Sequence, residues 1–307
     1  MRVVFFGTPE FAVPPLEALL GEGFDVVAAV TQPDKPQGRS RSTALPPPVK
    51  LAAQAEDVPV LQPERPSDAD FVARIRALAP DVGVVVAYGH ILKPDLLAVP
   101  RRGMINVHPS LLPELRGAAP VEWAILNGLE RTGVTIMLMD AGLDSGPILH
   151  QIPHHIDPEV TGGELSEHLS EMGAQALVEA LALLETDGLK PRPQDHERAT
   201  YASKLTRELA RIRWTDPADR VARVIRALDP KPGAWTELDG REVKLFGARV
   251  VEGEGQPGEV RTTDDGLRIT TGNGALLVDE VQPAGKPRMT AADWVRGRGV
   301  RAGQRFT

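Results

Sequence analysis

Three polar side chains, Asn106, His108 and Asp144, have the types and spacing that acyl-transfer chemistry needs. Asn106 and His108 are two residues apart in an apolar run that Pro109 ends, so a strand would place both on one face at its carboxyl end. An amide N–H can stabilise an oxyanion, and an imidazole exchanges protons near neutral pH. The pair therefore indicates attack on a carbonyl carbon that becomes tetrahedral.

Asp144 lies in a loop rich in aspartate and glycine, residues 140–146, that follows the next predicted strand. We expect this loop beside the same sheet edge, with Asp144 orienting His108 and collecting the proton of an attacking amine. The chain has no cysteine, and although Ser110 is close, no serine is placed as the nucleophile, which favours direct transfer between two bound substrates. Taken singly, these motifs are more typical of a capped turn, a surface histidine and an ordinary Asp/Gly turn, and it is their joint occurrence that favours a catalytic site.

The first half of the chain alternates predicted strands and helices. Strands are expected at 2–6, 24–31, 58–61, 81–87, 104–108, 133–140 and 148–156, and helices at 14–20, 68–79, 120–127 and 165–184. This pattern predicts an α/β fold with a mostly parallel, Rossmann-like sheet covered on both faces. The first turn carries only Gly7, without the G-x-G-x-x-G spacing of dinucleotide sites. A nicotinamide or flavin cofactor is therefore not expected.

The second half has a different pattern. A helix is expected at 217–228, followed by five short strands with hairpin turns at Asp239-Gly240, Asp265-Gly266 and Asn273-Gly274. Short strands joined by tight turns predict a small antiparallel β-barrel of the OB-like type, which often binds oligonucleotides. We therefore predict a catalytic domain over 1–187, a polar linker over 188–205 and a barrel domain over 206–307.

The composition is that of a globular chain, with 307 residues, 42% hydrophobic and 25% charged. With neither an apolar run of ~20 residues nor a signal-peptide pattern, a cytoplasmic location is expected. Residues 1–204 hold 17 Lys+Arg against 27 Asp+Glu, whereas residues 205–307 hold 18 against 15, so the second half suits a polyanionic partner. His154 and His155 lack a third ligand at metal spacing, and no metal site is predicted.

Longer motifs make the sequence resemble the methionyl-tRNA formyltransferase family. They are VVFFGTPEFAVPPLEALL (3–20), QPDKPQGRSRS…PPPVK (32–50), INVHPSLLPELRGAAP (105–120), TGVTIMLMDAGLDSGPIL (132–149) and KLTRELARIRW…RVIRALDPKPGAW (204–235). The resemblance runs from end to end. The Asn-x-His…Asp core is shared by all 10-formyltetrahydrofolate-dependent formyl transferases and hydrolases, and the other motifs narrow the family.

The resemblance implies that the formyl group of 10-formyltetrahydrofolate passes to the α-amino group of initiator methionyl-tRNA, with no metal and no NAD, in a monomer. Its implied catalytic residues are Asn106, His108 and Asp144. Its implied folate-binding residues are Ser110, Leu111, Leu112 and Pro113, with Val86, Ala87, Tyr88 and Gly89 along the pterin pocket. Its implied tRNA contacts are Arg39, Arg41 and Lys50. Arg213 departs from the family pattern, where many relatives are expected to have an acidic residue.

Four alternatives stay open at this point. A formyltransferase acting on a small amine, such as glycinamide ribonucleotide or an amino sugar, would not require the basic loop or the second domain. A formyltetrahydrofolate hydrolase would have the same three residues, and only acceptor-dependent turnover separates it. An RNA-binding protein on an inactive scaffold is disfavoured by the joint presence of Asn106, His108 and Asp144. A nicotinamide dehydrogenase is disfavoured by the missing glycines.

Overall fold

The computed structural model describes residues 1–37, 43–186, 188–263 and 266–307, which form two compact units. The first unit comprises residues 1–117, 131–155 and 166–202. The second unit comprises residues 118–130, 156–165 and 203–307. Two short segments of the predicted catalytic domain, 118–130 and 156–165, therefore belong to the second unit.

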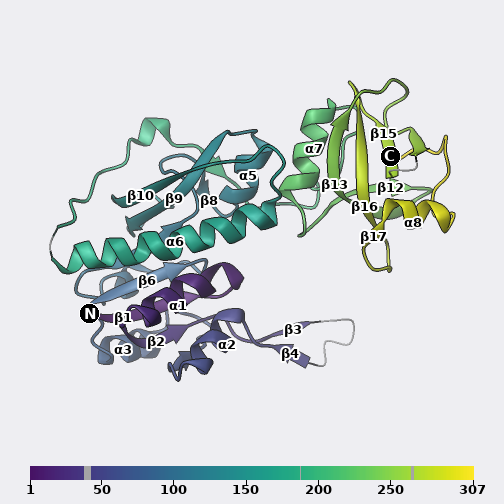
Figure 1. The fold of residues 1–307 in the computed structure, drawn as a ribbon. Helices are drawn as coiled ribbons and strands as arrows, with labels where there is room; N and C mark the ends of the chain where they lie inside the picture. Colours follow the sequence, from purple (N-terminus) through teal and green to yellow (C-terminus); the bar gives the residue numbers. More distant parts are fainter. Residues whose placement is uncertain (38–42, 187, 264–265) are drawn as a thin grey trace. The chain divides into compact units, whose positions relative to one another are not determined.

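A seven-stranded sheet forms the centre of the first unit (Figure 1). Its strands in spatial order are β10 (Ile148–His155), β9 (Arg131–Leu138), β7 (Met104–His108), β6 (Val82–Val86), β1 (Arg2–Gly7), β2 (Asp25–Val30) and β5 (Val60–Leu61). The five strands from β7 to β5 are parallel, and β6 is buried along its whole length, as expected for a strand covered on both faces. The predicted Rossmann-like, mostly parallel sheet is confirmed.

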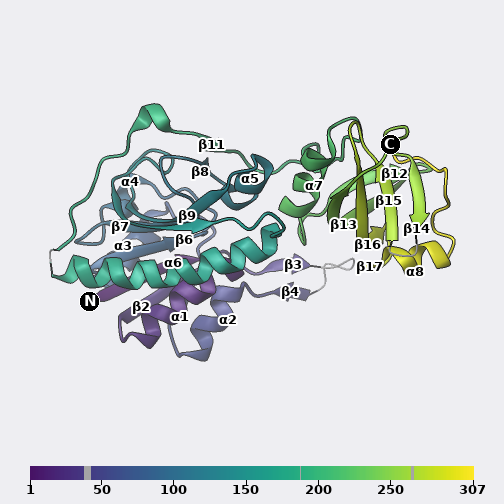
Figure 2. The same ribbon diagram turned by 45° about the horizontal axis from the view of Figure 1, so that its top comes forward.

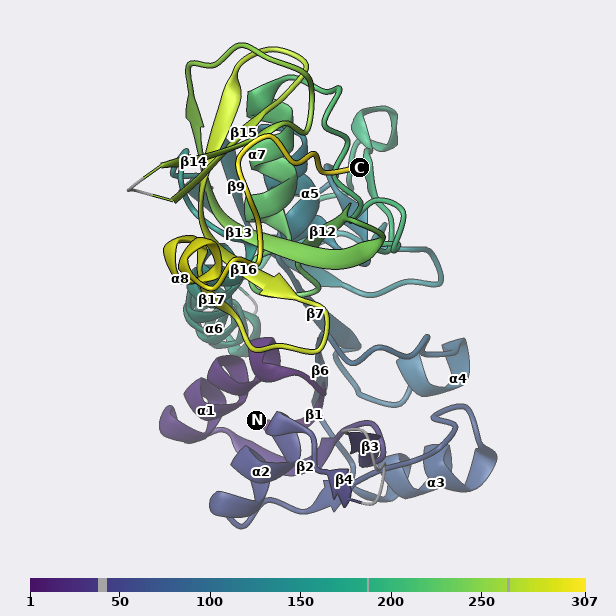
Figure 3. The same ribbon diagram turned by 90° about the vertical axis from the view of Figure 1, so that its right-hand side faces the viewer.

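Helices cover both faces of this sheet. They are α1 (Val13–Gly21), α2 (Pro48–Ala55), α3 (Ala69–Ala77), α4 (Pro94–Leu97) and α6 (Gly162–Glu185), with a 3₁₀ turn, η1 (Glu10–Ala12). Figure 3 shows α1 and α6 on one side of β1, β6 and β7, and α3 and α4 on the other. The chain runs outward from β1 to β2 and β5, and α3 then returns it to β6 on the other side of β1. The strand order therefore reverses between β1 and β6, where open α/β sheets place ligands.

The direction of β9 differs from the expectation. β9 runs antiparallel to β7, with Ile105 opposite Leu138 and His108 opposite Thr135. The carboxyl end of β9 thus lies beside the beginning of β7, not beside His108. The prediction that Asp144 follows a neighbouring strand to the same sheet edge is wrong, and a different route must bring it to His108.

The segment 32–50, predicted as a loop, contains two paired strands and the first residues of α2. β3 (Lys35–Gln37) pairs antiparallel with β4 (Thr43–Leu45), as Figure 2 shows. At the base of this hairpin the Lys50 ammonium lies 2.8 Å from an Asp34 oxygen, and the Gln62 amide donates to Asp34 at 2.7 Å. The Gln62 hydrogen bond, followed by Lys50, lowers the pKa of Asp34 below its usual range. These contacts fix the base of the hairpin.

The second unit is an antiparallel sheet with short helices. Its strands in spatial order are β12 (Ala234–Leu238), β13 (Arg241–Val251), β16 (Ala275–Pro283), β15 (Gly266–Thr270) and β14 (Val260–Thr263), and β17 (Met289–Thr290) pairs with β16. Its helices are α5 (Pro120–Leu126), α7 (Ala218–Ala227) and α8 (Ala291–Arg296). The predicted turn between β12 and β13 is confirmed, since Asp239 (φ 50°) and Gly240 (φ 72°) have the positive φ of a type I′ hairpin.

The closed barrel is not confirmed, because β12 and β14 form the two ends of the strand order in the described part of the sheet. The C-terminal tail bonds to both ends instead. Thr307 exchanges two backbone hydrogen bonds with Glu237 of β12, at 3.0 and 3.1 Å. On the other side the amide of Val260 donates to Gln304 and the amide of Phe306 donates to Gly258, each at 2.9 Å. The observed domain is an antiparallel sheet whose edges are satisfied by the tail.

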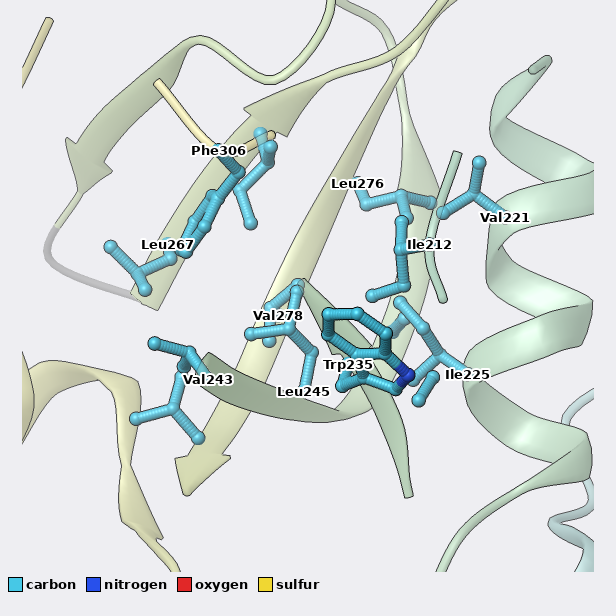
Figure 4. Packing of buried hydrophobic residues seen from close by; sticks show 14 of the residues in the cluster. Ile212, Val221, Ile225, Trp235, Val243, Leu245, Leu267, Leu276, Val278 and Phe306 are labelled. Atoms are coloured by element: carbon cyan, nitrogen blue, oxygen red, sulfur yellow. The ribbon is translucent and has the colours of Figure 1, made fainter. Parts of the chain in front are cut away.

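One hydrophobic core holds the second unit together (Figure 4). Val221 and Ile225 of α7 lie about one helical turn apart and therefore share one face of the helix. Both are buried in this core. Phe306, next to the last residue, is 1% exposed and stacks on Trp214 with ring centroids 5.7 Å apart. Trp235 is also buried and belongs to the same core. Among the described residues, no helix combines the length and apolarity that crossing a membrane requires.

Candidate active site

Asn106 and His108 project from β7, between β6 and β9. Asn106 is half-buried, and its side-chain amide makes no hydrogen bond with any residue in the described ranges. His108 is 4% exposed, and its Nε2 lies 3.0 Å from the carbonyl oxygen of Leu115. Asn106 thus has two N–H donors free for a ligand, while one nitrogen of His108 is already engaged.

The structure brings His108 and Asp144 together, with Nδ1 of the imidazole 3.8 Å from a carboxylate oxygen. A carbonyl oxygen only accepts, so the contact with Leu115 places a proton on Nε2. Nδ1 is therefore the nitrogen with a free lone pair, and it faces the carboxylate of Asp144.

Asp144 reaches His108 through a loop that folds back after β9. Its carboxylate accepts a hydrogen bond from the backbone N–H of Gly117 at 2.8 Å, and its backbone has a left-handed φ of 49°. Asp140 has another role, because it accepts from the Gly142 N–H at 2.9 Å and the Ser145 hydroxyl at 2.8 Å and is exposed. Of the two carboxylates in this loop, Asp140 shapes the loop and Asp144 faces the histidine.

Gln194, which the sequence pattern did not identify, connects the two segments that hold this pair. Its side-chain N–H₂ donates to the carbonyl oxygens of Asp144, at 2.9 Å, and Gly146, at 2.8 Å. Its side-chain oxygen accepts from the guanidinium of Arg116 at 2.6 and 3.1 Å. Arg116 precedes Gly117, the donor to Asp144, and follows Leu115, the acceptor for His108. One buried amide therefore fixes both halves of the pair.

The chain around Gln194 supports the same segment. β11 (Tyr201–Ala202) runs parallel to β8 (Arg116–Gly117), and a 3₁₀ turn, η2 (His196–Arg198), precedes it. The Leu115 N–H donates to the Thr200 hydroxyl at 2.8 Å. Gly117, with φ 123°, is required because a Cβ there would lie 2.5 Å from the carbonyl oxygen of Ala202. The segment predicted as a linker, 188–205, thus supplies a buried side chain and a strand to the first unit.

Both parts of the chain match known protein families. Residues 1–181 match the formyl transferase family model, and residues 204–299 match that of the formyl transferase C-terminal domain. A methionyl-tRNA formyltransferase of Magnetococcus marinus is 48% identical over 306 residues, covering 99% of this chain and 98% of the relative. One of Roseiflexus sp. is 49% identical over 310 residues, covering 100% and 95%. The chain belongs to the methionyl-tRNA formyltransferase family.

Solved structures share the formyltransferase fold. HypX from Aquifex aeolicus, in complex with tetrahydrofolic acid, matches with a TM-score of 0.71 at 21% identity, covering 98% of this chain and 48% of that one. An N-formyltransferase from Helicobacter canadensis, with folinic acid and dTDP-3-aminofucose, matches with a TM-score of 0.68 at 17% identity, covering 92% and 99%. At these identities the likeness is one of fold.

In this formyltransferase the expected folate-binding segment is held by its own hydrogen bonds. The buried Ser110 hydroxyl donates to the Glu114 carbonyl oxygen at 2.6 Å. Thr135 on β9 accepts from the Leu112 N–H at 3.1 Å and donates to the Ser110 carbonyl oxygen at 2.6 Å. Leu111 and Pro113 are half-buried and keep exposed surface. These two residues are the ones in the segment suited to an apolar ligand contact.

The expected wall of the pterin pocket, from Val86 to Gly89, divides between core and surface. Val86 is buried, Tyr88 is 1% exposed with its ring edge-on to Phe6, and Ala87 and Gly89 are exposed. The Tyr88 carbonyl oxygen accepts from the Thr8 hydroxyl and the Gln32 amide, each at 3.0 Å. Ala87 and Gly89 are therefore the residues here that can meet a ligand, and Tyr88 anchors the turn.

Replacing Tyr88 by phenylalanine is expected to leave stability at pH 8 unchanged or raise it by about 1 kcal/mol, because the buried hydroxyl has no hydrogen-bond partner among the described residues. Burial raises the pKa of Tyr88 from 10.0 to about 12. As pH rises, this tyrosine therefore ionises in the unfolded chain before it ionises in the folded protein. The free energy of unfolding of the parent falls accordingly between about pH 10 and 12. Urea unfolding should show the advantage of the variant growing by about 1 kcal/mol by pH 11. A variant less stable than the parent at pH 8 would contradict the unpaired hydroxyl.

Two expected tRNA contacts, Arg39 and Arg41, lie outside the described residues. The third, Lys50, is paired with Asp34 and its side chain is 20% exposed. A compensated, partly buried ammonium is suited to anchoring the hairpin, and that structural role accounts for its position.

Proposed function

We propose that this protein transfers the formyl group of 10-formyltetrahydrofolate to the α-amino group of initiator methionyl-tRNA. The observation that carries the proposal is the approach of His108 and Asp144 at 3.8 Å beside the free amide of Asn106, in a chain 48% identical to a methionyl-tRNA formyltransferase. The fold it shares with folate-bound structures supports the choice of formyl donor.

In the proposed reaction the neutral amine attacks the formyl carbon, and a new N–C bond forms as the carbonyl oxygen becomes an oxyanion. Asn106 donates a hydrogen bond to that oxygen. Nδ1 of His108 handles the proton lost by the amine, and the carboxylate of Asp144 stabilises the imidazolium so formed. The bond from the formyl carbon to N10 of the folate then breaks, and N10 takes up the proton. The numbers of atoms and protons balance without a metal or a redox partner.

We further propose that the second unit and the basic segment 32–50 together bind the tRNA. Residues 205–307, which belong to the second unit, hold 18 Lys+Arg against 15 Asp+Glu, and their antiparallel sheet, with edges bonded by the tail, is the counterpart of the predicted OB-like barrel. A small amine acceptor would need neither feature. We also propose that the enzyme is cytoplasmic and that it acts as a monomer. Light scattering at working concentration tests the oligomeric state.

The experiment that tests the function follows the formyl label. The protein is incubated with labelled 10-formyltetrahydrofolate and methionyl-tRNA, glycinamide ribonucleotide or no acceptor. Label recovered on the methionyl-tRNA alone supports the proposal. Transfer to the ribonucleotide indicates a small-acceptor enzyme, and release of formate at the same rate without acceptor indicates a hydrolase.

Replacing Arg39 by alanine is expected to raise KM for tRNA several-fold while leaving KM for the folate unchanged. The segment carries Lys35, Arg39, Arg41 and Lys50 against Asp34, and each lost phosphate contact weakens binding in a salt-dependent way. Steady-state kinetics at two salt concentrations provide the measurement. Equal changes in both KM values would count against a tRNA contact.

Replacing Gln194 by glutamate is expected to lower kcat about 10- to 100-fold, with KM for both substrates within twofold of the parent. The new carboxylate still accepts from Arg116, but it cannot donate to the carbonyl oxygens of Asp144 and Gly146. Misplacing a catalytic group by about 1 Å can cost up to about 100-fold in rate. Gln54→Glu, exposed on α2, is the matched control. If a folded Gln194→Glu variant kept the parental kcat, a role of Gln194 in positioning Asp144 would be excluded.

A further inference from the structure

A pocket of about 600 Å³ lies wholly within the second unit. It is bounded by α5, by the segment 206–216 and by α7. Its volume falls within the range of about 300–1,000 Å³ typical of small-molecule sites. Neither Asn106, His108 nor Asp144 lines it, so the proposed formyl-transfer reaction leaves it unexplained.

The lining of the pocket includes an aromatic ring and aliphatic side chains. The indole N–H of Trp123 on α5 donates to the Ser203 carbonyl oxygen at 2.8 Å, which fixes the ring while leaving it half-buried. Leu209 and Val224, both partly buried, line the same pocket. A fixed aromatic ring beside aliphatic side chains offers a surface on which a planar heterocycle can stack.

The charged part of the lining has more cations than anions. It contains Arg211, Arg213, Arg220 and Arg223 against Glu208 and Asp216. Arg220 pairs with Asp216 at 3.3 Å, and Arg213 lies 4.0 Å from Glu208. Arg211 and Arg223 have no carboxylate partner among the described residues, although the Arg211 guanidinium lies 5.1 Å from the Trp235 ring centroid. Two guanidinium charges therefore remain for an anionic ligand.

The side chain of Arg223 is fixed by packing, but its buried Nε–H has no hydrogen-bond partner among the described residues. A Cβ at Gly128 would lie 3.4 Å from its Cδ, Nε and Cζ atoms, so the side chain rests on the backbone of this glycine (φ 65°). A buried donor left unpaired costs about 1–3 kcal/mol, more for a charged group. The other guanidinium nitrogens of Arg223 make no hydrogen bond among the described residues either, so a ligand oxygen in the pocket can engage them.

We propose that this pocket binds a nucleoside phosphate, with the base against Trp123 and the phosphate on the guanidinium groups of Arg211 and Arg223. A lining that combines an aromatic ring and aliphatic side chains with surplus arginine matches a ligand that has both a heterocycle and an anion. Free mononucleotides and nucleotides within an RNA strand share this chemistry. The inference does not rest on the proposed formyl transfer, since binding is measured without that reaction.

The test is calorimetric titration of the full-length protein with AMP, adenosine, inorganic phosphate and single-stranded hexaadenylate. We expect AMP to bind at least tenfold more tightly than adenosine or phosphate, because each of these lacks half of the contacts. Arg223→Gln and Arg211→Gln should each weaken AMP binding at least tenfold. Arg241→Gln, on β13 and outside the pocket, removes the same charge from the same unit and should leave binding unchanged.

The source of the nucleotide follows from the hexaadenylate titration. An RNA strand is the source if the hexamer binds at least tenfold more tightly than AMP and Arg223→Gln reduces this affinity; a free nucleotide is the source if the two ligands bind equally. The proposal is overturned if neither ligand binds at millimolar concentration, if phosphate binds as tightly as AMP, or if Arg241→Gln has the same effect as Arg223→Gln. Circular dichroism and formyl transfer to methionyl-tRNA, measured on each variant, separate failure of this site from failure of the fold or of the proposed function.

Discussion

Replacing Asn106 by alanine is expected to lower kcat about 100- to 1,000-fold in a protein that remains folded. Loss of one oxyanion donor raises the barrier by about 2.7–4 kcal/mol, because the donor acts most strongly when the carbonyl oxygen becomes charged. Since the Asn106 amide has no partner among the described residues, its removal leaves no other polar group unpaired. The effect should therefore fall on the rate of formyl transfer and not on stability.

The measurement is single-turnover formyl transfer with both substrates saturating, together with thermal unfolding of the same preparation. Asn106→Asp is the informative companion, because it has nearly the same shape but replaces the donor by an oxygen. It should be at least as slow as Asn106→Ala. A folded alanine variant that works within tenfold of the parental rate would exclude Asn106 as the oxyanion donor.

Replacing Asp144 by asparagine is expected to lower kcat about 100-fold or more, within the range of about 10²–10⁴ attributed to positioned acid–base groups. The amide oxygen of asparagine can still accept from the Gly117 N–H, which lies 2.8 Å from the carboxylate in the parent. Asparagine also tolerates the left-handed backbone found at this position, where φ is 49°. The fold should persist while the charge beside Nδ1 of His108 is lost.

Asp140→Asn is the matched control, because it removes a carboxylate from the same loop. Asp140 is exposed and bonds to Gly142 and Ser145 within the loop, so the control should keep kcat within a few-fold of the parent. The pH dependence of kcat should also change in Asp144→Asn and not in Asp140→Asn. Equal losses in both variants would show that the loop's shape, and not the charge at residue 144, determines the rate.

Local patterns predicted most of the elements. The strand 104–108 appears with the expected bounds. Asp239 and Gly240 form the expected turn between two strands, because both residue types tolerate the positive φ that this turn needs. These features follow from rules that act over a few residues: alternation along a strand, helical spacing, and the φ preferences of particular residue types. Such rules could not predict how the edges of the second sheet are paired, because the C-terminal tail, distant in sequence, bonds to both edges.

Local patterns do not indicate which partners Tyr88 and Lys50 contact within the protein. Tyr88 follows a buried strand and is predicted along the pterin pocket; its ring packs edge-on against Phe6, and its contact with folate stays a prediction. The ammonium of Lys50, a predicted tRNA contact, pairs with Asp34, and its contact with tRNA stays a prediction. In each case a partner distant in sequence decides the orientation, and the sequence near the residue does not reveal that partner.

The sequence by itself determined that Asn106 and His108 share one strand, because their spacing of two and the following proline fix both face and position. Only the tertiary structure decided how Asp144 joins them. β9 runs against β7, so the loop must fold back, and it is held by Gln194, 50 residues further along, and by Gly117, 27 residues earlier. The physical reason is that these hydrogen bonds form between segments that meet only when the sheet and the chain beyond α6 have folded, and no rule of local spacing encodes such a meeting.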